Sequence, residues 1–513
     1  MDQFRISNFR VFEEFHAFEI APITILTGKN NSGKSSLIRA LMVLDDLLNG
    51  RDQTRLDFST SSVKDFIPIF ENAKNLSSRK NEIELGITIH PIQFDFILKS
   101  DANYNAILAS LQISSLDSED KIVLTRVGEE FDIEMKADLL SLFLTPSLPK
   151  LPIQNTLEEA ELLLELNLIK EEKHALRDKT ELIKLIDKEN TIKSRLSNLK
   201  KLQDSDFIQS AFQTPIKKRV QIARSDAKIS DIFLEYFNLV ESNPGAGFKR
   251  KDFMDFVENN KLPLSKLDSL LSIQTIHIGI NRIKQQRLFH RETNDSEISQ
   301  IVNYLGEFPL KPKSKAKKFL IKWLGKDYYD IATNYEIRYY EKSAAALFLT
   351  HRGKAFNIAD LGYGTGQLTS ILLDLAALIH RYEDIPSSAE EKDTIIIMIE
   401  EPETNLHPRM QSLLADLFYD AVQISKEYFN LRLIVESHSE YLIRKLQLNI
   451  AKDEMSKDDA VIHYMDFNSD QDEKHRKIDF AKNGSLSDSF GPGFYDEAAK
   501  QSIELNRIIR SKK

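Results

Sequence analysis

The sequence Gly28-Lys29-Asn30-Asn31-Ser32-Gly33-Lys34-Ser35 decides the fold of this chain. A short β-branched apolar run, residues 23–27, precedes it, and residues 36–41 have helical character. A strand, a glycine loop and a helix in this order make a phosphate-binding loop (P-loop). The glycines let backbone N–H groups approach a phosphate, and the helix N-terminus adds unpaired N–H groups. We therefore expect ATP as the ligand, held by Gly28, Asn30, Asn31, Ser32, Gly33, Lys34, Ser35 and Ser36.

The chemistry of such a site needs a cation, a metal and an acid. Lys34 is expected to reach the β- and γ-phosphates, and the Ser35 hydroxyl to bind Mg²⁺. A nucleoside triphosphatase also needs a carboxylate near the metal, and we expect it at the end of a buried strand beside the P-loop strand. The most strand-like run, residues 394–399, ends in Glu400 and Glu401. Glu400 is predicted to hold Mg²⁺, and Glu401 to orient and deprotonate the attacking water.

Composition excludes several other classes of protein. A length of 513 residues favours two or three structural units over one. The absence of cysteine excludes disulfides, thiolate catalysis and cysteine-ligated zinc. No apolar run is long enough for a membrane helix, and the first residues lack the segments of a signal peptide. We expect a cytoplasmic protein without a membrane partner.

The charge distribution leaves contact with DNA open. A net charge of −9 argues against a chain that coats nucleic acid over its whole surface. A lysine-rich stretch at residues 311–318 is equally compatible with a nucleic-acid patch and with a solvated face, so it does not decide the function. The same holds for a second basic patch, which contains Arg282, Lys284, Arg287, His290 and Arg291.

The order of the motifs resembles a known family. The P-loop, the segment Glu400-Glu401-Pro402-Glu403-Thr404-Asn405-Leu406-His407-Pro408 and the segment Val435-Glu436-Ser437-His438-Ser439-Glu440 resemble ABC-type ATPases. The resemblance is to those related to the OLD proteins and, more distantly, to SMC-like DNA-repair ATPases. Residues 8–12, 63–66 and 360–367 are similar to family segments in the same order.

This resemblance implies an ATP site shared by two subunits. In the family a signature loop reaches across a dimer interface to the γ-phosphate held by the partner's P-loop, which implies a homodimer or higher homo-oligomer here. His438 matches the switch histidine on the γ-phosphate side of the site. The residues that match the signature loop, and are expected to contact nucleotide, are Gly362, Gly364, Thr365, Gly366 and Gln367.

Three departures from the family pattern predict slow turnover. Glu400 stands where many ABC-type heads have aspartate, and Gly366 stands where related sequences often carry serine. No segment makes a convincing glutamine loop.

The predicted fold class is α/β: an ABC-type P-loop ATPase head with an antiparallel β subdomain and an inserted helical or coiled-coil arm. Alternating runs at residues 82–89 and 131–135 indicate the antiparallel sheet. Residues 156–202 are rich in Leu, Glu and Lys with seven-residue spacing, which fits an extended arm, a helical hairpin or an ordinary packed subdomain. The expected boundaries are 1–150 and 271–455 for the two halves of the head, 151–270 for the insertion and 456–513 for a small C-terminal domain.

The leading functional hypothesis is an ATPase that controls a separate effector, a nuclease or a toxin, as in bacterial antiviral defence systems built on OLD-like ATPases. Several OLD-type proteins continue into a nuclease domain, for which the segment after residue 455 is too short, so the effector is expected on another polypeptide. One alternative is an SMC-like DNA-repair or chromosome-associated ATPase that binds DNA. The other is an ATP-stabilised scaffold that holds a toxin.

Overall fold

The chain forms two compact units in the computed structural model, which describes residues 1–117, 121–135, 193, 216–221, 227–242, 267, 270–271, 273–280, 286–290, 297–340, 343–385, 392–466, 474–491 and 494–511. The first unit comprises Met1–Ile87, Ile97–Ile107 and Leu271–Lys513, and the second comprises Thr88–Phe96 and Leu108–Leu270. Apart from Lys193, the predicted arm at residues 156–202 lies outside the described residues.

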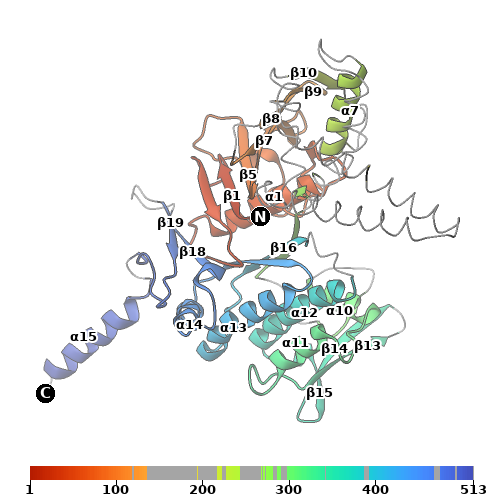
Figure 1. Cartoon of the computed structure of the whole chain (residues 1–513). Coiled ribbons are helices and arrows are strands. Elements are labelled where there is room, and N and C mark those ends of the chain that lie inside the picture. Colours follow the sequence, from red (N-terminus) through yellow and green to blue (C-terminus); the bar gives the residue numbers. More distant parts are fainter. Residues whose placement is uncertain are drawn as a thin grey trace, which may run out of the picture. The chain divides into compact units, whose positions relative to one another are not determined.

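A six-stranded sheet lies at the centre of the first unit (Figure 1). Its order is β11-β16-β17-β3-β18-β19; the first five strands are parallel, and β19 is antiparallel to β18. Every residue of β3 is buried, as the apolar sequence of a central parallel strand predicts. The strands are β3 (Ile23–Gly28), β11 (Gln274–Ile278), β16 (Thr394–Glu400), β17 (Asn430–Glu436), β18 (Ala460–Met465) and β19 (His475–Asp479).

The strand order corrects one expectation from the sequence. β16, which ends in Glu400, is not beside the P-loop strand β3, because β17 lies between them. In the ladder Glu400 is opposite Glu436, and Glu436 is opposite Leu26 of β3. The acid next to the P-loop strand is therefore Glu436. Sequence could not order these strands, since buried parallel strands share one apolar pattern.

Helices cover this sheet and complete one apolar core. α1 packs on β3 and β11, α13 packs on β17 and α14, and α12 packs against α10, α11 and α13. The core joins strand residues such as Ile25, Ile397 and Leu433 to helix residues such as Leu372 and Phe418. The helices are α1 (Lys34–Leu48), α10 (Glu297–Glu307), α11 (Lys315–Leu324), α12 (Tyr363–Glu383), α13 (Pro408–Ser425) and α14 (Glu440–Ala451).

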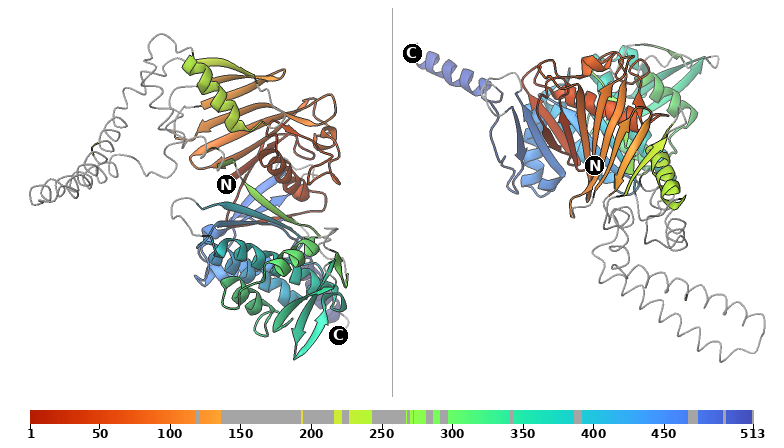
Figure 2. Two further views of the ribbon diagram at one scale, coloured as in Figure 1. Left: turned by 90° about the vertical axis from the view of Figure 1, so that its right-hand side faces the viewer. Right: turned by 90° about the horizontal axis from the view of Figure 1, so that it is seen from above.

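Two further sets of strands belong to the first unit. α10 packs on a four-stranded sheet of order β12-β14-β13, with β15 on β14. β1 pairs antiparallel with β2 and neighbours β5. These strands are β1 (Gln3–Ser7), β2 (His16–Glu19), β12 (Phe289–His290), β13 (Asn334–Tyr340), β14 (Ala344–His351) and β15 (Lys354–Asn357). The last helix is α15 (Glu497–Ser511), at the C-terminal end of the chain in Figure 2. Its side chains are exposed wherever they are described.

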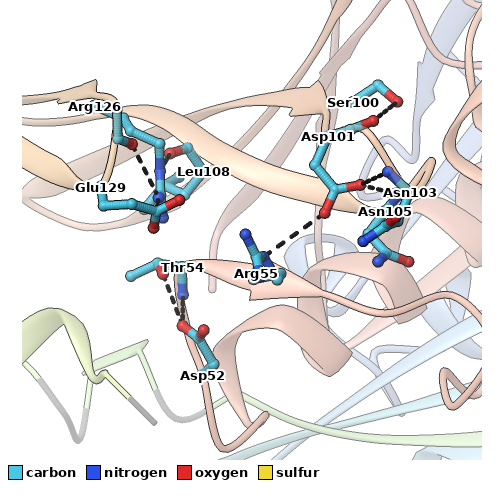
Figure 3. A network of polar contacts seen from close by, with 11 residues as sticks. Asp52, Thr54, Arg55, Ser100, Asp101, Asn103, Asn105, Leu108, Arg126 and Glu129 are labelled. Atoms are coloured by element: carbon cyan, nitrogen blue, oxygen red, sulfur yellow. Dashed lines mark hydrogen bonds and ion pairs between the residues drawn. The ribbon is translucent and has the colours of Figure 1, made fainter. Parts of the chain in front are cut away.

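Antiparallel strands follow α1 in the chain. In the second unit the order is β10-β9-β8-β7, and α7 packs on β10. The alternating runs at 82–89 and 131–135 are β5 and most of β9, which confirms that prediction. In the first unit, Figure 3 shows Asp101 accepting hydrogen bonds from the backbone of Asn103 and Asn105 in the turn after β6. The elements are β4 (Arg55–Leu56), α2 (Phe70–Ala73), β5 (Glu82–Ile89), β6 (Ile92–Ser100), β7 (Ala106–Ser115), β8 (Lys121–Val127), β9 (Glu130–Met135), β10 (Ile216–Gln221) and α7 (Ile229–Ser242).

The lysines of the first basic patch have acidic or aromatic neighbours. Lys311 pairs with Asp384, Lys315 pairs with Glu427, and Lys317 lies over the Tyr335 ring. Two of the five lysines in this patch are therefore paired with acids within the chain. Within the described part of the chain, no helix combines the length and apolarity needed to cross a membrane.

Candidate nucleotide site

The P-loop backbone forms an open cradle at the start of α1. Gly33 is the N-cap residue with φ 98°, and its position has no side-chain cap, so the first N–H groups of α1 are not capped by a side chain. Gly28 has φ 137°, and a Cβ there would overlap the Met465 carbonyl at the end of β18. The glycine at 28 is thus required by the close approach of β18 as well as by backbone conformation.

A cavity of about 350 Å³ lies over this cradle. Its wall contains cations from two segments, Arg10 and Arg39, in addition to the P-loop lysine. The guanidinium of Arg39 lies over the Phe66 ring, and its buried Nε has no hydrogen-bond partner within the described structure. The lining residues are Arg10, Val11, Asn31, Ser32, Gly33, Lys34, Ser35, Ser36, Arg39 and Glu436.

Lys34 and Ser35 both meet Glu436 at the bottom of this site. Lys34 Nζ donates to the carbonyls of Gly28 (3.3 Å) and Lys29 (2.8 Å), and lies 3.9 Å from a Glu436 oxygen. Ser35 Oγ donates to the other Glu436 oxygen at 2.8 Å. Burial lowers the pKa of Lys34, an effect that Glu436 and Glu401 oppose. Burial raises the pKa of Glu436 to about 7, against its contacts with Ser35 and Lys34.

Glu400 is buried at the end of β16 and is held by a histidine. Its Oε1 lies 3.1 Å from His277 Nε2, on the neighbouring strand β11. Glu400 also acts electrostatically on Glu436, in keeping with their opposite positions in the ladder. The predicted metal ligand thus lies in the same group of acids as Glu436, one strand further from the P-loop.

Glu401 adopts a strained backbone conformation immediately after β16. Its φ is 41°, in the left-handed region that side chains other than glycine rarely enter. Its N–H donates to the Glu436 carbonyl at 2.8 Å, and its carboxylate accepts from Thr404 Oγ1 at 3.0 Å. Its charge opposes the lowering of the pKa of both Lys34 and His438. Such strain is typical of functional positions.

His438 is exposed after β17 and is positioned from two sides. Its backbone N–H donates to the buried Glu403 carboxylate at 2.6 Å, and its ring centroid lies 6.5 Å from that of Phe494. Partial desolvation and the charge of Lys34 lower the pKa of His438. Burial raises the pKa of Glu403, and the His438 N–H opposes this.

The predicted signature residues lie at the start of α12 and do not line the cavity among its described residues. Gly362 and Tyr363 are exposed, whereas Gly364 and Gly366 are buried. A Cβ at Gly364 would overlap the Asn405 carbonyl, so this glycine has a packing role within the chain. Gln367 is also buried, and its side-chain amide donates to the Ile280 carbonyl at 3.1 Å.

Several residues of the site were missed from sequence. Glu436 ends an apolar strand in the same way as Glu400, so the sequence pattern could have predicted it as a site acid. His277 and Arg39 carried no motif, because their relation to the site depends on strand order and helix packing.

The residues present fit ATP with Mg²⁺. Ser32 Oγ is buried and has no hydrogen-bond partner within the described residues, and Lys34 faces carbonyls and a carboxylate in the P-loop. Ser35, Glu400 and Glu436 supply the oxygen atoms that Mg²⁺ prefers. This loop and the parallel sheet behind it define an α/β P-loop ATPase head.

Comparison with known proteins agrees with this class. The family model described as AAA ATPase domain matches residues 1–443, and the chain belongs to this family. The chain therefore contains an ATPase domain of ABC type, as the motifs predicted.

One curated relative is the endonuclease GajA of Bacillus cereus (strain HuB5-5). It is 22% identical over 441 residues, which are 83% of this chain and 53% of GajA, so this chain spans about half the length of that relative.

The comparison with solved structures matches SMC head domains at low TM-scores. That of Pyrococcus furiosus, with an extended coiled coil and bound to the C-terminal domain of ScpA, is 9% identical with a TM-score of 0.33 and coverage of 99% of each chain. That of Thermotoga maritima is 10% identical with a TM-score of 0.31, covering 94% of this chain and 98% of the other.

Proposed function

We propose that this chain binds ATP with Mg²⁺ at the P-loop and hydrolyses it in a head-to-tail homodimer. The observation that supports this best is buried Lys34 in a cavity with Ser35, at the carboxyl ends of strands that carry glutamates. Lys34 binds the β- and γ-phosphates, and Ser35 and Glu400 hold the metal. The metal neutralises phosphate charge when bound. Glu401 orients the attacking water and accepts its proton, and His438 contacts the γ-phosphate side.

The biological role that we propose is control of a nuclease effector in antiviral defence. The similarity to the endonuclease GajA supports this proposal, because the matched region covers most of this chain but only about half of GajA. That the effector is a separate polypeptide, and that turnover is slow, stay predictions from the sequence. Within the described part of the chain Lys311 and Lys315 are paired with acids, which gives the DNA-binding alternative less support.

Replacing Lys34 tests the nucleotide site directly. Lys34→Ala should weaken ATP binding on the order of 100-fold, because it removes a buried charge-assisted contact to the phosphates. Lys29→Ala is the matched control, since Lys29 is in the same loop but is exposed and paired with Asp466. Calorimetric titration of both folded variants measures the effect. Equal ATP affinity of Lys34→Ala and the unmodified chain would contradict the site.

A further inference from the structure

Glu436 is a buried acid inside a pocket built for phosphate. It ends β17, beside the P-loop strand, and is 6% exposed. One carboxylate oxygen accepts from Ser35 Oγ at 2.8 Å, and the other lies 3.9 Å from Lys34 Nζ. It lines the cavity together with P-loop residues 31–36. The Glu436 carboxylate therefore contacts Ser35 and lies near Lys34, the side chains that are expected to bind Mg²⁺ and the triphosphate.

The Glu436 carboxylate and a bound triphosphate would repel each other and compete for Lys34. A triphosphate brought to Lys34 meets the Glu436 carboxylate in a poorly solvated pocket, where repulsion is stronger than in water. Glu400 and Glu401 add to the negative charge around Glu436. Ser35 is the expected metal-binding hydroxyl, and Glu436 already contacts it. A divalent cation at Ser35 would therefore lie next to this carboxylate and offset the repulsion.

We propose that Glu436 makes nucleotide binding at this P-loop conditional on a divalent cation. With the cation bound, the carboxylate lies beside Ser35, attracts the positive charge and stabilises the complex. Without the cation, the same carboxylate repels the phosphates, and it accepts the hydrogen bond that Ser35 Oγ donates. This inference rests on the proposed function, and it assigns to Glu436 a task separate from the metal-holding role of Glu400.

The ratio of ATP affinities with Mg²⁺ and with EDTA measures this coupling without any turnover. Binding of a non-hydrolysable ATP analogue is titrated at pH 8 for the unmodified chain and for Glu436→Gln. The unmodified chain should bind far better with Mg²⁺. Glu436→Gln should reduce the ratio at least about tenfold, mainly by tighter binding in EDTA, because the amide removes the charge and keeps the shape. Glu440→Gln, on the first turn of α14, is the matched control and should keep the ratio.

Two more variants keep the proposal open to refutation. Glu436→Asp retains the charge and should still bind weakly in EDTA. Glu436→Met, a second neutral variant of similar length, replaces Glu436→Gln if that variant does not fold. If the neutral variants show the same ratio of affinities, with Mg²⁺ and with EDTA, as the unmodified chain, this inference is wrong but the proposed function still stands. An unmodified chain that binds no analogue even with Mg²⁺ overturns the proposed function instead.

Discussion

At the scale of single residues, adjacent acids at the end of β16 have different surroundings. Glu400 is buried and contacts His277, whereas Glu401 is partly exposed, has a left-handed backbone and contacts Thr404. A general base has to reach a water molecule, and a metal-holding acid has to stay fixed. The surroundings agree with the roles proposed for the two residues.

Glu401→Gln should therefore separate binding from hydrolysis. We expect ATP binding to remain within a few-fold and hydrolysis to fall roughly 10²- to 10⁴-fold, the usual contribution of a general base. Phosphate release under single-turnover conditions measures the rate. Glu400→Gln is the comparison and should instead raise the Mg²⁺ concentration needed for half-maximal activity. Hydrolysis by Glu401→Gln at the unmodified rate would place the base elsewhere, with Glu403 and His438 as the next candidates.

At the scale of elements, a buried histidine, His463, and the partly buried His475 join β2 to the edge of the six-stranded sheet. His463 on β18 lies 2.9 Å from His475 on β19, and its other ring nitrogen lies 2.8 Å from the Glu19 carbonyl. The His475 ring packs on Phe18 at 4.3 Å between centroids and faces His16 at 6.2 Å. The charged groups that act electrostatically on His463 are Glu19, Lys477 and Asp479, whereas His475 is acted on by His463 and His16.

These contacts predict a loss of stability in acid. Burial lowers the pKa of His463 to about 4 and, together with repulsion from His463 and His16, that of His475 to about 3. In the unfolded chain both histidines bind protons near pH 6.5. The unfolded chain therefore takes up more protons than the folded chain as pH falls from about 6.5 to about 3. The stabilisation is complete above about pH 6.5 and is lost progressively as pH falls from there toward the folded-state pKa values.

Urea unfolding at pH 7.5 and pH 5 measures this loss. His475→Phe keeps a ring against Phe18 but cannot titrate, so the difference between the two pH values should be smaller in this variant. His290→Gln, an exposed position, should keep the difference of the unmodified chain. If the free energy of unfolding changes equally between the two pH values in all three proteins, the histidine pair does not cause the pH dependence of stability.

At the scale of the whole molecule, the proposed dimer needs a surface that can reach a partner. At the start of α12, Gly362 is exposed and a Cβ there meets no atom within 4 Å, whereas Gly364 is packed against Asn405. A bulky residue at 364 would disturb the chain itself. Gly362 is therefore the position at which to block the predicted contact with a partner's nucleotide.

Mixing two defective chains tests whether sites are completed in trans. Lys34→Ala and Gly362→Trp chains should each be inactive, but their heterodimer has one intact site and one site with both lesions. Random pairing of equal amounts should restore about one quarter of the unmodified ATPase activity. Mixing two preparations of Lys34→Ala is the control. No recovery, with heterodimers present by mass spectrometry, would contradict independent sites shared between subunits.

The sequence by itself determined the P-loop, the buried strands and the acids that end β16, because these depend on local order: a strand, a glycine loop and a helix, or an apolar run before polar residues. It also predicted the antiparallel strands at 82–89 and 131–135 from their alternation. Only the tertiary structure decided that β17 separates β16 from β3, that Glu436 meets Ser35, and that Gly364 serves packing against Asn405. These facts depend on which buried segments become neighbours, and segments with the same apolar pattern carry no local signal of their partners.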